Sequence, residues 1–176
     1  QCKTFDKDAN GFVLGDGIGV LLLRRLDDAV REKNHIYGII KGIATNHVGD
    51  SSTLTAPRIE AQEEVISSAY KEAGIRCDTT NYIEAHGTGT SMGDPIEVEA
   101  LTNVFRKCAN EKHFCQIGSV KTNIGHTGGA AGMAGVIKVL MMMRNKQIPP
   151  SLNFNIPNPV INFEDFPFCV STELSE

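Results

Sequence analysis

The chain has 176 residues and a formal net charge of −4, with 41% hydrophobic and 22% charged side chains. This composition is typical of a globular domain with one sizeable core and argues against disorder. Lysine and arginine are scattered along the chain, so the sequence predicts no nucleic-acid partner. The apolar runs are too short to cross a bilayer and no signal peptide is seen, which predicts a cytoplasmic protein without membrane contact.

The first residue and the cysteines give two further expectations. The sequence starts at Gln1 rather than Met and enters an apolar run soon afterwards, so we expect it to be a segment of a longer chain. The five cysteines form no Cys-x-x-Cys pair and their number is odd. We therefore expect free thiols in a reducing compartment rather than a disulfide framework.

The first half of the chain contains two apolar runs and an amphipathic stretch. The runs Ile18–Leu23 and Ile36–Ala44 predict two buried strands, separated by a short polar helix around Asp27–Lys33. After Pro57, apolar residues recur at helical spacing up to Gly74. This spacing predicts an amphipathic helix with a glycine at its C-terminal cap.

The middle of the chain predicts a strand, a loop and a helix. The short run Tyr82–Ala85 indicates a buried strand that leads into a loop rich in glycine and threonine. Asp94 then predicts an N-cap and Glu97 its capping-box partner, with Pro95 at the first helical position. This helix should run to about Lys107.

The last third repeats the alternation. We expect a strand at Gln116–Val120, a second glycine-rich loop, a helix from about Gly128 to Arg144 and a last strand at Phe168–Thr172. Strands that alternate with helices in this way predict an α/β layered fold, in which helices pack against a mixed sheet.

Two loops place a histidine directly after a predicted strand. His86 lies in EAHGTGTSMGDP, and His126 lies in SVKTNIGHTGGAAG. Small residues in such loops let the backbone and a ligand approach closely, and ligands of α/β sheets usually bind at strand ends. We therefore expect His86 and His126 to lie in one pocket.

These two motifs resemble the histidine motifs of β-ketoacyl synthases, and in particular the ketosynthase domains of type I polyketide synthases. The resemblance covers essentially the whole chain and includes DKDANGFVLGDGIGVLLLRRLDDA near its start, LTAP at 54–57 and IPPSLNF further on. It implies a thiolase-like layered fold (α-β-α-β-α), mainly its C-terminal half. Residues 1–35 would end the N-terminal half, and residues 36–176 would form the C-terminal half, truncated before its last glycine-rich loop.

The resemblance also implies an acyltransferase of the 3-oxoacyl-acyl carrier protein synthase type. The reaction is a decarboxylative Claisen condensation of an acyl thioester with malonyl-acyl carrier protein, in polyketide or fatty-acid biosynthesis. The family's nucleophilic cysteine would lie upstream of Gln1, so the chain alone is expected to be inactive. The implied partners are an acyl carrier protein, whose phosphopantetheine arm carries the substrate, and a second copy in a homodimer of the full-length parent. No directly bound cofactor or metal is implied.

The same resemblance assigns roles within the two loops. His86 and His126 would be neutral hydrogen-bond donors to the malonyl thioester oxygen, and Lys121 would order them electrostatically. A helix that begins just after His126 disfavours a positive charge on that ring. Thr88 and Thr90 match positions whose hydroxyls hold the pantetheine arm, although a role only as turn formers stays open.

One alternative function and the subtype of polyketide synthase stay open at this point, and one further class of protein is disfavoured. A decarboxylase, or a non-condensing ketosynthase homologue, would keep the fold but lack the upstream cysteine. The tetrapeptide NHVG at 46–49 resembles the NHGG form of some polyketide synthases that borrow their acyltransferase, and it leaves the subtype open. A nucleotide- or carrier-binding module is disfavoured, because the sequence has no GxxxxGK[ST] motif and no GxGxxG between a strand and a helix with a downstream acid.

Overall fold

The computed structural model describes residues 1–49 and 57–176. Its centre is a three-stranded sheet of β1 (Tyr82–Glu84), β2 (Cys115–Gly118) and β3 (Phe168–Val170), in that order. Both strand pairs are parallel. The α/β prediction is confirmed, but the sheet that these strands form is parallel rather than mixed.

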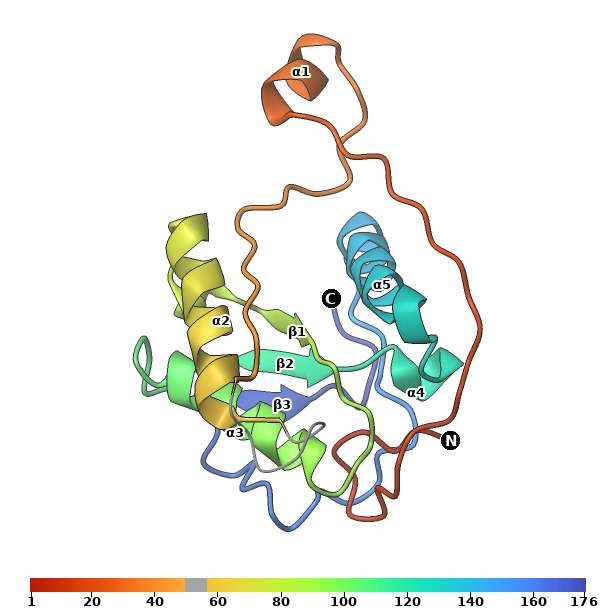
Figure 1. Cartoon of the computed structure of the whole chain (residues 1–176), viewed down its shortest axis with the longest axis vertical. Coiled ribbons are helices and arrows are strands. Elements are labelled where there is room, and N and C mark those ends of the chain that lie inside the picture. The colour runs from red at the N-terminus through yellow and green to blue at the C-terminus, as the bar shows by residue number, and fades with distance from the viewer. Residues whose placement is uncertain (50–56) are drawn as a thin grey trace.

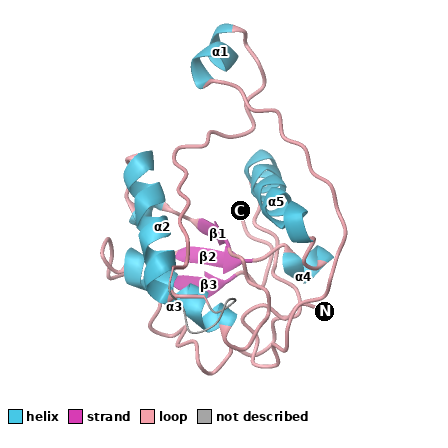
Figure 2. Ribbon diagram, in the orientation of Figure 1, coloured by secondary structure: helices cyan, strands magenta, loops and turns pink. Residues whose placement is uncertain are grey.

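Helices cover both faces of this sheet (Figures 1 and 2). Helices α2 (Ile59–Ala73) and α3 (Gly93–Phe105) pack against each other on one face, and α5 (Ala131–Asn145) contacts β1 on the other. Because side chains alternate along a strand, Ile83 of β1 joins the core on the α3 side while its neighbours point toward α5. The result is a helix–sheet–helix arrangement with the site at the carboxyl ends of the strands.

The hydrophobic core lies between the sheet and α3 and is rich in aromatic rings. The rings of Phe105 and Phe168 meet edge to face with centroids 4.9 Å apart, a favourable geometry for aromatic pairs. The N-terminal segment contributes Phe5, which is fully buried. The cluster comprises Phe5, Cys77, Ala85, Val98, Leu101, Val104, Phe105, Cys115, Ile117, Ile161 and Phe168.

Most of the helices predicted from the sequence are present. The helix after Pro57 is α2, which ends at Gly74 in the left-handed conformation with a φ of 63°. The short polar helix is α1 (Leu26–Arg31), and the last helix begins with a 3-10 turn at Gly128–Ala130 that leads into α5. Two further short elements are the 3-10 turn Cys77–Thr79 and the one-turn helix α4 (Lys121–Ile124). Of the LTAP match, the residues 54–56 lie outside the described part of the chain.

The two strands predicted near the start of the chain are wrong. Neither Ile18–Leu23 nor Ile36–Ala44 is a strand, and the backbone arches away from the sheet to carry α1 at its far end (Figure 1). Ile18 is 96% exposed and Leu22 is 97% exposed. An apolar run becomes a strand only where a neighbouring strand pairs with its backbone groups, and within residues 1–49 and 57–176 these runs have no such neighbour.

This exposed apolar arch should limit the solubility of the 176-residue chain on its own. We expect aggregation, and we expect the double substitution Ile18→Lys/Leu22→Lys to raise the soluble fraction, because charges on the arch oppose self-association. Sedimentation at matched protein concentrations measures the effect. Lysines at the exposed polar positions Asn10 and Asn110 form the control. A fully monomeric, soluble parent chain would contradict the expectation.

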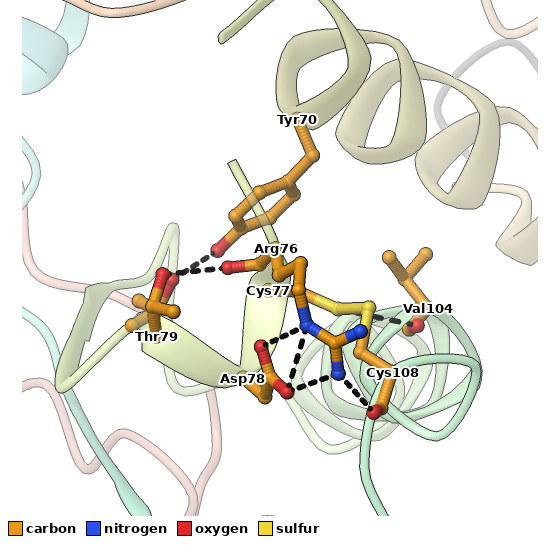
Figure 3. Close-up of a disulfide and its surroundings, with 8 residues drawn as sticks. Tyr70, Arg76, Cys77, Asp78, Thr79, Val104 and Cys108 are labelled. Atoms are coloured by element: carbon orange, nitrogen blue, oxygen red, sulfur yellow. Dashed lines mark hydrogen bonds and ion pairs between the residues drawn. A yellow bond between two sulfur atoms is a disulfide. The ribbon is translucent and has the colours of Figure 1, made fainter. Parts of the chain in front are cut away.

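Two cysteines are joined, which corrects the prediction that all five are free thiols (Figure 3). Cys77 opens the 3-10 turn after α2, Cys108 follows α3, and their Cα atoms lie 6.1 Å apart. Arg76 donates hydrogen bonds to Asp78 and to the carbonyl of Cys108 beside the bridge. The pairing depends on how the turn packs against α3, which the cysteine spacing does not encode. The free cysteines are Cys2, Cys115 and Cys169.

The disulfide closes a segment with a sequence separation of 31 residues. The chain-entropy treatment gives such a cross-link a stabilising effect of about 3 to 4 kcal/mol. In the full-length parent protein, Cys77→Ser/Cys108→Ser should therefore lower the melting temperature measured without reductant by several degrees. Cys169→Ser, at a free and partly exposed thiol, is the matched control. Equal melting temperatures for the double variant and the control would rule out a stabilising role.

Candidate active site

The two predicted histidines lie beside each other. The ring centroids of His86 and His126 are 5.5 Å apart, and the ring planes meet at 85°. His86 follows β1 and His126 follows α4, so the two loops leave neighbouring parallel strands at the same edge of the sheet. The ring of Phe12, from the N-terminal segment, lies 5.0 Å from that of His126. His86, His126 and Lys121 line one cavity, whose walls also include α5 and the segments 20–24 and 34–40.

Glycines allow the first loop to pass close to its neighbours. Gly87 has a φ of 44°, in the left-handed region that favours glycine. A Cβ atom at Gly87 would lie 2.6 Å from Cγ2 of Thr4 and 2.8 Å from Cβ of Ser119. The Thr4 hydroxyl also donates a 2.6 Å hydrogen bond to the Gly87 carbonyl. The N-terminal segment therefore helps to shape the loop that carries His86.

The carboxylate of Glu97 binds the backbone of this loop. Its two oxygens accept hydrogen bonds from the backbone N–H of His86 at 2.6 Å and of Gly87 at 2.8 Å. Burial of the carboxyl group raises the pKa of Glu97, and these two hydrogen bonds oppose that effect. The predicted role of Glu97 in a capping box is wrong, because its side chain serves the histidine loop rather than the start of α3.

Asp94 also differs from its predicted role as an N-cap. Helix α3 starts earlier, at Gly93, so Asp94 lies in its first turn and its side chain points to the loop. The two carboxylate oxygens accept the N–H of Gly89 at 3.0 Å and of Phe5 at 2.8 Å. Burial raises the pKa of Asp94 against the lowering effect of these bonds. Asp94 thus ties the N-terminal segment to the first loop.

Thr88 and Thr90 follow His86 in the same loop. Thr88 is buried, and the two hydroxyl oxygens are 3.4 Å apart. The Thr90 hydroxyl oxygen accepts a hydrogen bond from the N–H of Gly93 at 3.1 Å. Thr90 therefore supports the start of α3, a role that the sequence had suggested for Asp94. The binding of a pantetheine arm by these two threonines stays a prediction.

Lys121 is a buried cation between the two loops. It is only 4% exposed, and burial lowers its pKa, while the nearby charges of Glu97 and Glu84 raise it. The positive charge of Lys121 also acts on His86. The pKa of His86 is lowered first by partial burial and then by the charges of Lys121 and His126. The environment of His86 therefore favours the neutral imidazole.

The orientation of His126 is set by hydrogen bonds to its ring and its backbone. The Gly128 N–H donates to Nδ1 of His126 at 3.1 Å, so in the neutral ring the hydrogen lies on Nε2. The His126 N–H donates to the carbonyl of Val13 at 2.8 Å, and the Gly15 N–H donates to the carbonyl of His126 at 3.1 Å. His126 thus presents an N–H donor, with its ring held by Gly128 and its backbone held by the N-terminal segment.

The loop-holding carboxylates Asp94 and Glu97 were not recognised as part of the site from the sequence. Their signal, an acid at i and i+3 just after a glycine-rich loop, is the same pattern that caps a helix. Among residues 1–49 and 57–176, no three His, Cys, Asp or Glu side chains converge in a way that could hold a metal ion. No helix in those ranges has the length and apolar character needed to span a membrane.

Family comparisons agree with the motifs. The family described as "Beta-ketoacyl synthase, C-terminal domain" matches residues 37–155, and "Beta-ketoacyl synthase, N-terminal domain" matches residues 1–29. The chain belongs to the β-ketoacyl synthase family. The first match alone covers more than half of the 176 residues and includes both histidine loops.

Similar proteins narrow the assignment to the ketosynthases of polyketide synthases. Polyketide synthase PksL of Bacillus subtilis (strain 168) is 51% identical over 99% of this chain and 4% of its own length. Highly reducing polyketide synthase 40 of Fusarium mangiferae is 43% identical over 94% of this chain and 7% of its own length. The sequence-based assignment to this type of ketosynthase is confirmed.

Solved structures confirm the thiolase-like fold. The ketosynthase from module 6 of the bacillaene synthase of B. subtilis 168 has a TM-score of 0.98 at 51% identity, over 99% of this chain and 31% of that chain. The oxazolomycin ketosynthase domain OzmH KS7 of Streptomyces albus JA3453 has a TM-score of 0.96 at 35% identity, over 99% and 31%. The chain therefore spans 31% of these two ketosynthases and 7% or less of the curated synthases named above.

The lowered pKa of His86 predicts that the stability of the protein depends on pH. The pKa of His86 lies below its ordinary value of 6.5, so the neutral form should persist to lower pH than in a free histidine. Folding stability that depends on this neutral form is present above pH 6.5 and falls as the pH drops below it.

Lys121→Met should raise the pKa of His86, because it removes a neighbouring positive charge. In the full-length parent, the NMR titration of the His86 ring should then move to higher pH. The control is Lys112→Met, at an exposed lysine before the opposite end of β2. An unchanged His86 titration in Lys121→Met would show that this charge does not act on His86.

Proposed function

We propose that this chain provides the histidine half of a polyketide-type ketosynthase site, which catalyses the decarboxylative condensation of an acyl thioester with malonyl-acyl carrier protein. The observation that carries the proposal is the contact between His86 and His126, whose rings lie 5.5 Å apart in one cavity. The hydrogen bond from Gly128 to Nδ1 of His126 leaves an N–H on Nε2 to face a substrate oxygen.

The chemistry requires donors at the oxygen on which charge develops. When the malonyl group loses carbon dioxide, the electrons of the broken C–C bond move toward the thioester oxygen and form an enolate. Two N–H donors, from His86 and His126, would stabilise that oxygen. The enolate carbon then attacks the acyl thioester carbonyl, a new C–C bond forms, and the cysteine thiolate leaves. Preorganised donors of this kind typically accelerate such steps roughly 10² to 10³-fold each.

The surroundings of the pair support neutral histidines in this role. The pKa of His86 is lowered by partial burial, by Lys121 and by His126, so the ring is available as a neutral donor at neutral pH. Lys121 would act through its charge rather than by transferring a proton to the substrate. Thr88 and Thr90, in the loop beside His86, would hold the phosphopantetheine arm of the acyl carrier protein. A homodimer of the full-length protein is part of the same proposal.

The test uses the full-length parent ketosynthase. His86→Ala and His126→Ala should each lower the rate of carbon dioxide release from malonyl-acyl carrier protein roughly 100-fold or more, because each removes one donor. Acylation of the nucleophilic cysteine, followed by mass spectrometry, should remain close to normal. His113→Ala, at a histidine bound to the Phe163 carbonyl away from the cavity, is the control.

Two results would contradict these roles. One is unchanged decarboxylation in either variant, and the other is a loss of acylation as large as the loss of decarboxylation. The product distinguishes the non-condensing alternative: a protein of that kind would release carbon dioxide from malonyl-acyl carrier protein without forming a 3-oxoacyl product.

A further inference from the structure

A polar cluster lies on the face of the sheet opposite the hydrophobic core. Tyr82 and Glu84, two residues apart on β1, both point toward Lys138 of α5. The Lys138 ammonium donates to Oε2 of Glu84 at 2.8 Å and to the Tyr82 hydroxyl oxygen at 2.7 Å, and the Tyr82 hydroxyl donates to Oε2 of Glu84 at 2.8 Å. The Lys138 and Glu84 side chains are 11% and 12% exposed.

The second oxygen of Glu84 reaches the other histidine loop. Oε1 accepts a hydrogen bond from the backbone N–H of Val120, the residue directly before Lys121 and α4. One carboxylate therefore joins three segments: the end of β1, from which His86 follows, the start of the turn that leads to His126, and helix α5 beyond that turn.

Glycines make room for this cluster. A Cβ atom at Gly118, on β2, would lie 2.8 Å from the Tyr82 hydroxyl oxygen. A Cβ atom at Gly135, on α5, would lie 3.0 Å from Cγ of Glu84. A larger residue at either position would require the Tyr82 hydroxyl or the Glu84 side chain to shift. The backbone of β2 thus lies against the Tyr82 hydroxyl, and the backbone of α5 lies against the Glu84 side chain.

The chemistry of the cluster favours a fixed geometry. Burial of Tyr82, followed by the charge of Glu84 and the hydrogen bond to it, raises the pKa of the phenol, so the hydroxyl remains a donor. Hydrogen bonds in which one partner is charged are short and strong. Removal of the cation from a buried ion pair strongly destabilises the folded protein, because it leaves an unpaired buried carboxylate. Glu84 is therefore held on one side by Lys138 and Tyr82, with Oε1 left to hold the Val120 N–H.

We propose that Glu84 is a positioning residue, which sets the distance between the two histidine rings by tying the Val120 turn to the end of β1. The proposal rests on the proposed function, since its readout is the decarboxylation that His86 and His126 would promote. Glu84 also lines the cavity of the two histidines, but both of its carboxylate oxygens are engaged in the hydrogen bonds above, so it would act through the backbone of the second loop. A shift of about 1 Å in such a donor can lower a rate on the order of 100-fold.

The experiment separates the loop contact from the burial of charge. In the full-length ketosynthase, Glu84→Gln/Lys138→Met removes both charges but keeps an oxygen that can accept the Val120 N–H. Glu84→Ala/Lys138→Met removes both charges and the acceptor. We expect the first double variant to keep kcat for malonyl decarboxylation within several-fold of the parent, and the second to lose roughly 10- to 100-fold. Cysteine acylation and the KM for malonyl-acyl carrier protein should change little in either.

The outcomes are distinguishable from failure of the proposed function. A parent ketosynthase that releases no carbon dioxide from malonyl-acyl carrier protein would refute the proposed function itself. With an active parent, equal kcat values for the two double variants, whether high or low, would overturn the positioning role. Glu99→Gln, at an exposed glutamate on α3, provides the control for loss of a negative charge and should match the parent.

Discussion

The hydrogen bonds from His86 and Gly87 to the Glu97 carboxylate are the contact on which the arrangement of the site depends. A carboxylate that accepts two backbone N–H groups fixes both the position and the direction of the loop, and each such charge-assisted bond contributes roughly 1.5 to 3 kcal/mol. The cost is the burial of a negative charge, which the nearby ammonium of Lys121 partly offsets. The first histidine and the buried lysine are therefore parts of one electrostatic unit.

The second constraint is that the site draws on chain segments far apart in the sequence. The N-terminal segment supplies Phe5 to the core, and Asp6 accepts the backbone N–H groups of Asn155 and Ile156. Although burial acts to raise it, the pKa of Asp6 is lowered by backbone hydrogen bonds from these residues and Asp8. The start of the chain thus contacts the first loop, the second loop and a segment about 150 residues later, so segments far apart in the sequence build the site together.

Much of the fold and the pairing of the two histidines could be predicted, because they depend on local patterns. The helical spacing of apolar residues predicted α2 with its cap at Gly74, and short apolar runs that lead into glycine-rich loops predicted β1 and β2. What failed depends on distant partners. The run Ile18–Leu23 has strand composition but no strand to pair with, and Cys77 meets Cys108 through tertiary packing. Asp94 matches a helix cap by type and position, and only the three-dimensional path of the loop shows what it binds.

The bridge between Cys77 and Cys108 has a topological consequence for the first histidine loop. The segment from 77 to 108 is a covalent ring that contains β1, His86 and α3, whereas Lys121 and His126 lie outside it. A protease that cuts the ring once leaves the new ends attached through the sulfur atoms. The nicked protein would therefore gain only the mass of one water and would not separate into fragments until it is reduced. The elements that hold His86 would stay together, whereas the second loop has no such covalent protection.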